Sequence, residues 1–148
     1  MELKFQVRAK IGKPREEVFD AVANSQKLSQ YFTTGGSSGA LREGTRVIWK
    51  FADYPGNIPV FVKKVTPNEL IVFEWNAESL SSGYMTTVEI AFESLGPRIT
   101  LVRVEESGWH ETPSGLKSSY MNCEGWMNML CCLKAWLEHN INLREGFY

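Results

Sequence analysis

The sequence predicts an α+β protein in which an antiparallel sheet packs against one long helix near the C-terminus. Three observations carry this prediction. The first residues alternate between polar and apolar, the middle of the chain divides into short apolar segments separated by turns, and the last quarter has apolar residues at helical spacing. Strands that are grouped between helices and joined by hairpin-length turns favour an antiparallel sheet over a wound parallel one.

The N-terminal segment has the alternation of a strand with one face in the core and the other in water. Its apolar positions are Leu3, Phe5, Val7, Ala9 and Ile11. A short helix is expected over residues 14–22, because Pro14 suits a first helical turn and two glutamates follow at the positive end of the dipole. Asn24 or Ser25 can cap a second short helix over residues 26–32.

The middle of the chain predicts five more strands. They span residues 45–51, 58–66, 70–76, 84–92 and 98–106. Turns are expected where proline stands beside glycine or asparagine, at Pro55-Gly56, Pro67-Asn68 and Leu95-Gly96-Pro97. These residues favour turn conformations. Two polar segments, 33–39 and 77–83, are predicted to be loops.

The last quarter of the chain predicts a helix over residues 116–141, with no internal proline and a single glycine, Gly125. Apolar residues at steps of three and four form one face of this helix. They are Trp126, Leu130, Leu133, Leu137 and Ile141, and the face extends toward the N-terminus through Tyr120 and Cys123. A sheet that curls around a long helix is a common place for a ligand pocket.

Length, charge and composition indicate one domain that spans residues 1–148. Sixteen basic against seventeen acidic residues leave a net charge of −1, and no Lys/Arg-rich run is present, which argues against nucleic acid as a partner. No apolar run approaches the roughly 18 residues of a membrane span, and the N-terminus lacks the apolar core of a signal peptide. Three cysteines without framework spacing favour a reducing compartment, so a cytoplasmic location is expected.

Six short motifs follow one another along almost the whole chain. They are PREEVFDAV (residues 14–22), LSQYF (28–32), LREGT (41–45), FEW (73–75), TLVRVEESGW (100–109) and GWMNMLCCLK (125–134). Together they resemble the START-like (SRPBCC, helix-grip) superfamily, and within it the AHSA1 branch, related to the C-terminal domain of the Hsp90 ATPase activator. The chain departs from the pattern at Tyr31, where Trp is usual, at Thr45, where a second Gly is common, and at Glu106, where His is frequent.

The resemblance implies a helix-grip fold, with a curved antiparallel sheet of six or seven strands around the long helix and two short helices after the first strand. It leaves three functions open. The first is binding of a hydrophobic or aromatic small molecule in an internal cavity, with no cofactor. The second is a co-chaperone-like interaction with Hsp90, and the third is a cyclase/aromatase- or hydrolase-type activity. A monomer or a weak dimer is expected.

Large side chains on the strands, in the loop before the helix and on the helix are candidates for the wall of such a cavity. They are Trp49, Phe61, Trp75, Trp109, Tyr120 and Met127. The alternative for each is an ordinary core position, because large aromatic side chains dominate protein cores in general.

Three titratable residues are candidates for acid–base chemistry: Glu106, Glu74 and His110. If Thr100, Val102 and Val104 point inward by alternation, Glu106 does too. A desolvated carboxylate can act as acid, base or hydrogen-bond acceptor. The alternative is that the strand has ended and Glu106 is solvated. The direction of Glu74 stays open because its strand is apolar on both faces, and His110 either borders the cavity mouth or lies in solvent. No His/Cys cluster has metal-ligand spacing, so no metal is expected.

Overall fold

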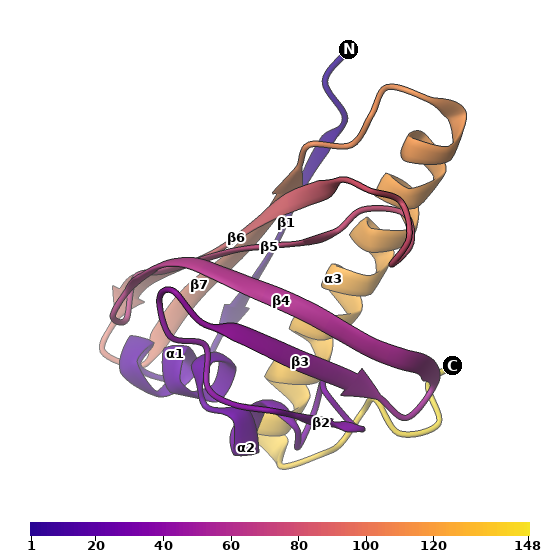
Figure 1. Cartoon of the computed structure of the whole chain (residues 1–148). Coiled ribbons are helices and arrows are strands. Elements are labelled where there is room, and N and C mark those ends of the chain that lie inside the picture. Colours follow the sequence, from indigo (N-terminus) through magenta and orange to yellow (C-terminus); the bar gives the residue numbers. More distant parts are fainter.

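The computed structural model describes residues 1–148 and contains a curved, seven-stranded antiparallel sheet with a long helix, α3, across its inner face (Figure 1). The strands lie in the order β1-β7-β6-β5-β4-β3-β2. Their bounds are β1 Lys4–Ile11, β2 Gly36–Ser37, β3 Arg46–Phe51, β4 Tyr54–Thr66, β5 Leu70–Asn76, β6 Met85–Gly96 and β7 Ile99–Ser107. The helices are α1 Arg15–Ala23, α2 Ser25–Leu28 and α3 Pro113–His139. The predicted α+β helix-grip fold is confirmed.

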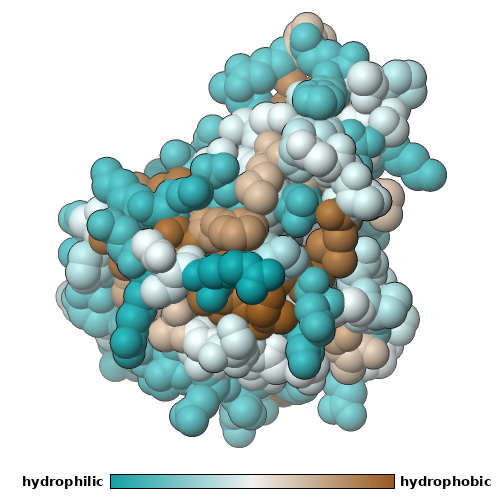
Figure 2. Space-filling view, viewed as in Figure 1, coloured by the Kyte–Doolittle hydropathy of each residue, from teal (hydrophilic) through white to brown (hydrophobic).

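The alternation of side chains along the strands decides which residues face α3. β1 pairs with β7 along its whole length, and β7 also pairs with β6. Every second residue of β7 is fully buried, namely Thr100, Val102, Val104 and Glu106. Because successive side chains of a strand point to opposite faces, Glu106 takes the last inward position of β7. The residues between them lie on the outer face of the sheet and are partly exposed. The side of the molecule shown in Figure 2 is mostly hydrophilic, with separate apolar patches.

The two short helices cover one end of the sheet and contact β6, β7 and β2. Pro14 lies at the N-cap of α1, one residue before the helix begins. The side chain of Asn24 caps α2 by accepting hydrogen bonds from two backbone N–H groups. Tyr31 follows α2, and its buried hydroxyl donates to the carbonyl of Ala21 at 2.9 Å, which ties this segment to α1.

Helix α3 begins and ends with well-defined caps. The Thr112 hydroxyl accepts a hydrogen bond from the N–H of Gly115 at 3.1 Å, and Pro113 occupies the first helical position. Asn140 ends the helix in the left-handed conformation, with φ of 54°. The side chains that α3 buries most deeply against the sheet lie in its C-terminal half, at Trp126, Met129, Leu130, Cys132 and Leu133. None of the helices combines the length and the apolar character needed to cross a membrane.

Several local predictions are wrong. The turn expected at Pro55-Gly56 lies at residues 52–53, and β4 begins at Tyr54, which pairs with Phe51 across an irregular end of the hairpin. The second helix stops at Leu28, and residues 29–32 form a turn. The predicted loop 33–39 contains the short strand β2, because backbone groups there can pair with β3.

The predicted apolar face of the long helix also needs correction at both ends. Ile141 lies beyond the helix and is half exposed, and Tyr120 is 67% exposed. At about 100° per residue, Tyr120 lies about 120° around the helix from Trp126, whereas its neighbour Ser119 lies on the buried side.

Candidate functional site

A buried carboxylate at the end of β7 organises one side of the interior. Glu106 is 0% exposed, and four side chains donate hydrogen bonds to it. Its Oε1 accepts from Trp126 Nε1 at 2.9 Å, and its Oε2 accepts from Trp75 Nε1 at 2.9 Å and Thr86 Oγ1 at 2.6 Å. Asn122 Nδ2 lies 3.1 Å from both oxygens. We call these five residues the Glu106 cluster, and they join β5, β6, β7 and α3.

The electrostatics of the Glu106 cluster are a balance between burial and hydrogen bonding. Burial raises the pKa of the Glu106 carboxyl above its ordinary value, because the charged form loses its hydration. The hydrogen bonds from Thr86, Trp75, Trp126 and Asn122 lower the pKa and offset part of that rise. Both oxygens are already occupied by protein donors. Glu106 is therefore placed to hold the surrounding side chains rather than to exchange a proton with a bound molecule.

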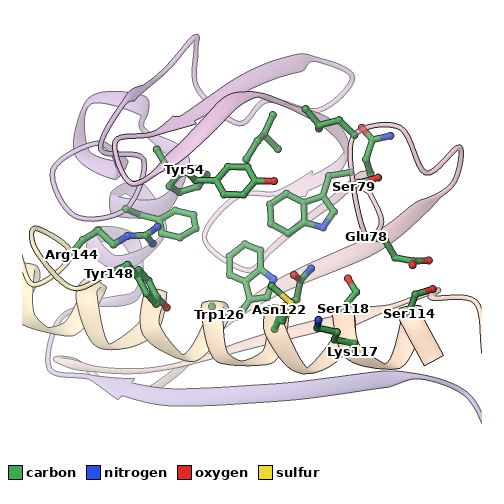
Figure 3. A pocket seen from close by; sticks show the side chains of 18 residues that line it. Tyr54, Glu78, Ser79, Ser114, Lys117, Ser118, Asn122, Trp126, Arg144 and Tyr148 are labelled. Carbon is green, nitrogen blue, oxygen red and sulfur yellow. The ribbon is translucent and has the colours of Figure 1, made fainter. Parts of the chain in front are cut away.

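A cavity of about 490 Å³ lies between α3 and the strands, directly beside the Glu106 cluster (Figure 3). Half of its 18 lining residues are hydrophobic. The rings of Trp75 and Trp126 form a central part of the wall, with their centroids 5.4 Å apart and their planes tilted by 35°. Because Glu106 accepts from both indole N–H groups, these two rings turn apolar surface toward the cavity.

The segment after α3 closes one end of the cavity. The Arg144 guanidinium donates two hydrogen bonds of 2.9 Å to the Asp53 carboxylate in the β3–β4 turn. It also lies over the rings of Phe51 and Tyr148, at 5.1 and 5.2 Å from their centroids. The bonds from Arg144 lower the pKa of Asp53. At this end, the charges of Arg144 and Asp53 neutralise each other, and the rings of Phe51 and Tyr148 pack against the guanidinium. Figure 3 shows Arg144 and Tyr148 together there.

Polar side chains gather at the opposite end, near the start of α3 (Figure 3). Glu78 accepts a short hydrogen bond from the Tyr84 hydroxyl, and this bond, together with one from Ser114, lowers the pKa of Glu78. The Tyr84 ring stacks on His110, with the centroids 3.6 Å apart and an angle of 5° between the planes. These contacts tie the loop between β5 and β6 to the loop before α3.

The family of the chain follows from a comparison with family models. The model for activator of Hsp90 ATPase homolog 1-like proteins matches residues 13–138. The chain belongs to this family. The START-like assignment made from the motifs is thereby confirmed. A separate search of curated protein sequences gave no match.

Solved structures of this fold come from several organisms. A Staphylococcus saprophyticus protein is 26% identical, with a TM-score of 0.79 over 95% of this chain and 96% of that one. Aha1 from Colwellia psychrerythraea, solved as a dimer in solution, is 25% identical, with a TM-score of 0.75 over 92% and 96%. An Hsp90 activator from Plasmodium falciparum is 19% identical, with a TM-score of 0.74 over the same shares, and it supports the fold alone.

The cavity of this AHSA1-like chain includes one of the six predicted wall residues, Trp75. Trp49 does not line the cavity and is a core residue, 1% exposed, whose ring centroid lies 6.1 Å from that of Trp75. Trp109 is buried against Phe5, with centroids 5.6 Å apart, and its Nε1 donates to Ser118 Oγ, which does line the cavity.

The other three predicted wall residues lie outside the cavity. Phe61 stands between two buried valines of β4, so strand alternation turns its ring to the outer face, under the guanidinium of Arg46. Tyr120 and Met127 are exposed on the side of α3 that faces away from the cavity.

The three acid–base candidates are not brought together. Glu106 is buried in its cluster, as the alternation of β7 indicates. Glu74 lies opposite Phe61 on the outer face of the sheet, 3.8 Å from Lys63. His110 is exposed and stacks on Tyr84 at the cavity mouth. No group of three or more His, Cys, Asp or Glu residues is arranged to hold a metal ion.

Sequence reasoning missed several residues of the cavity, including Gly125, Asn122, Lys117, Ser118 and Arg144. Ser118, Asn122 and Gly125 lie on α3 at spacings of four and three residues, which is the same periodicity that marks the apolar face. A second, more polar stripe beside that face could have identified the α3 side of the cavity. Arg144 follows the helix, and nothing in the sequence relates it to Asp53.

Proposed function

We propose that this protein binds a small apolar or aromatic molecule in the cavity between α3 and the sheet. The observation that carries the proposal is the cavity itself. Its volume of about 490 Å³ falls within the roughly 300–1,000 Å³ of typical small-molecule sites. Trp75 and Trp126 contribute to its wall with their ring centroids 5.4 Å apart, and Figure 3 shows Ser114 and Lys117 toward one end and Arg144 at the other.

The Glu106 cluster supports this proposal, because it fixes the wall before any ligand arrives. An indole whose N–H is already bonded has no unpaired donor that a bound apolar molecule would cover. Such a molecule therefore loses no hydrogen bond to water at these two side chains. A wall held in place by hydrogen bonds also lowers the entropy lost on binding.

A glycine in the middle of α3 also supports the proposal. A Cβ added at Gly125 would meet no heavy atom within 4 Å, so protein packing does not require glycine there. By contrast, a Cβ at Gly115 would lie 2.1 Å from the His110 carbonyl oxygen. Glycine in a helix interior costs about 1 kcal/mol relative to alanine. Gly125 lines the cavity, and its missing side chain leaves room for a bound molecule.

Filling this space tests the proposal. In the Gly125→Leu variant the new side chain enters the cavity, and helix propensity should keep the free energy of unfolding equal or raise it by about 0.5–1 kcal/mol. We expect the variant to bind N-phenylnaphthylamine, an uncharged fluorescent apolar probe, at least about tenfold more weakly than the wild type.

The matched control is Cys131→Leu, which places the same side chain on an exposed position of α3 outside the cavity. It should bind the probe like the wild type. Equal binding to the Gly125→Leu variant would contradict the proposal, because the probe would then occupy another place. Native mass spectrometry of the purified protein would additionally reveal a co-purifying small molecule.

A second candidate function is a co-chaperone-like interaction with Hsp90, which the family match favours. Stimulation of Hsp90 ATPase activity by the purified chain is the test, and no stimulation at saturating concentration would remove this candidate.

Sedimentation measurements would decide between the expected monomer and weak dimer. The three free cysteines support the expected reducing compartment, the cytoplasm.

A further inference from the structure

The polar groups that line the cavity differ in whether the protein already satisfies them. This inference rests on the proposed function and asks which chemical class of ligand the cavity takes. At the closed end, Arg144 is paired with Asp53 through two hydrogen bonds. Along the wall, the Asn122 amide donates to Glu106. Neither group is free to pair with a ligand.

The opposite end has donors without a protein acceptor. Lys117 is an exposed residue that lines the cavity, and its ammonium takes part in none of the salt bridges or side-chain hydrogen bonds of the structure. The next residue, Ser118, accepts a hydrogen bond from Trp109 Nε1 at 3.2 Å, so its own O–H remains available to donate. Both residues lie on the cavity side of the same turn of α3 (Figure 3).

One acidic group stands at this end and has to be weighed against Lys117. The Glu78 carboxylate accepts hydrogen bonds from the Tyr84 hydroxyl and from Ser114, and the neighbouring His110 favours its charged form. Its charge is thus stabilised by groups of the β5–β6 loop, of the loop before α3 and of the first turn of α3. The ammonium of Lys117 has no such partner, and it is the cation left to pair with a ligand.

We propose that the ligand is an amphipathic anion, with an apolar body against Trp75 and Trp126 and a carboxylate or similar group at Lys117 and Ser118. Charge-assisted hydrogen bonds to an ammonium and a hydroxyl would fix the anionic group. The distance along α3 from Lys117 to Gly125 is about 12 Å, at 1.5 Å per residue. This length matches an aromatic acid of two or three rings, or a carboxylic acid with a chain of comparable length.

Two probes that differ in one charged group test this inference. Anilinonaphthalene sulfonate carries a sulfonate, and N-phenylnaphthylamine has the same ring system without it. In the Lys117→Gln variant, we expect the affinity for the sulfonate probe to fall about tenfold and the affinity for the uncharged probe to stay within about twofold of the wild type. Lys64→Gln, which removes an exposed lysine outside the cavity, should change neither affinity.

The companion variant Glu78→Gln tests whether this end of the cavity prefers a negatively charged ligand group. It should bind the sulfonate probe as tightly as the wild type or more tightly, because it removes a like charge from the same end of the cavity. An unchanged affinity for the sulfonate probe in Lys117→Gln would overturn the inference, as would an equal loss for both probes. If wild-type protein binds neither probe, the proposed function fails. If it binds only the uncharged probe, the cavity stands and the anionic ligand is wrong.

Discussion

The two halves of α3 have the same helical periodicity and different surroundings. In the C-terminal half, Met129, Leu130 and Leu133 are fully buried against the sheet. In the N-terminal half, Tyr120 and Met121 are largely exposed. The residues with which this half lines the cavity are mostly small or polar, among them Ser118, Asn122 and Gly125, and Met121 at the exposed rim is the apolar exception.

The Glu106 cluster lies at the boundary between these halves. Trp126 belongs to both, because its ring packs against Phe73 in the core and also lines the cavity. Its indole N–H and the amide of Asn122, one turn earlier, bind the same carboxylate. The comparison shows how one amphipathic helix supplies a dry core and a cavity wall. A buried acceptor fixes the side chains where the two meet, so the core does not collapse into the cavity.

Truncating one residue in each half should separate their roles most clearly. Leu130→Ala leaves a cavity in the core and should lower the free energy of unfolding by about 2–5 kcal/mol. Met121→Ala removes a side chain that is 61% exposed and should change it by no more than about 0.5 kcal/mol. Urea unfolding followed by tryptophan fluorescence measures both. Similar losses for the two variants would mean that the N-terminal half is packed as tightly as the core.

A smaller change in the free energy of unfolding is expected for Glu106, at the boundary between the two halves of α3. Glu106→Gln keeps the shape of the side chain but replaces one acceptor oxygen by an NH₂ group, so at least one donor of the cluster faces another donor. A buried donor without a partner costs about 1–3 kcal/mol. Glu105→Gln, on the outer side of β7, makes the same chemical change where no side-chain hydrogen bond is present, and it should stay within about 0.5 kcal/mol of the wild type.

The same Glu106→Gln variant also tests the role of the cluster in binding. If Glu106 holds the cavity wall, the variant should bind the uncharged probe more weakly at a temperature where it remains folded. An unchanged free energy of unfolding together with unchanged probe binding would show that the cluster does not define the boundary.

The sequence was sufficient to predict the sheet and the long helix. For Glu106 it gave two alternatives, an inward position and a solvated one, and the structure has the inward position. These features depend on periodicity, which one chain displays locally. Residues 100–104 alternate without interruption, and the residues from Trp126 to Leu133 repeat at helical spacing, so burial follows from position along the element. The prediction failed for Tyr120, because its position about 120° around the helix from Trp126 lies outside the buried stripe.

The cavity was less predictable, because its walls come from elements whose relative placement the sequence does not state. Phe61 and Trp75 are both aromatic strand residues, yet they lie on opposite faces, and the bulge in β4 is invisible in the sequence. The closure of one end by Arg144 depends on a contact with Asp53 that is remote along the chain. The sequence shows Gly125 as the single glycine of the long helix, but the role proposed for it depends on the open space beside it, which only the structure shows.

The smallest expected effect is a pH dependence that distinguishes the buried carboxylate from the paired one at the closed end. Burial raises the pKa of Glu106 in the folded state. The folded protein therefore keeps this proton at pH values where the unfolded chain has lost it, and stability decreases as pH rises from the unfolded pKa to the folded one. Asp53 has a lowered pKa, chiefly through its hydrogen bonds from Arg144, so its contribution is present above its unfolded pKa and is lost as pH falls through the folded one.

Comparing each variant with the wild type isolates these two contributions. The free energy of unfolding of wild type minus that of Glu106→Gln should decrease as pH rises from about 4 toward neutrality, and wild type minus Asp53→Asn should increase over the acidic part of the same range. Urea unfolding at a series of pH values measures both differences. If the Glu106 difference instead increases with pH, the hydrogen bonds that four side chains donate to the carboxylate outweigh its burial. Glu106 would then be a stable buried anion at the boundary of the cavity, and its contribution to the free energy of unfolding would increase as the pH approaches neutrality.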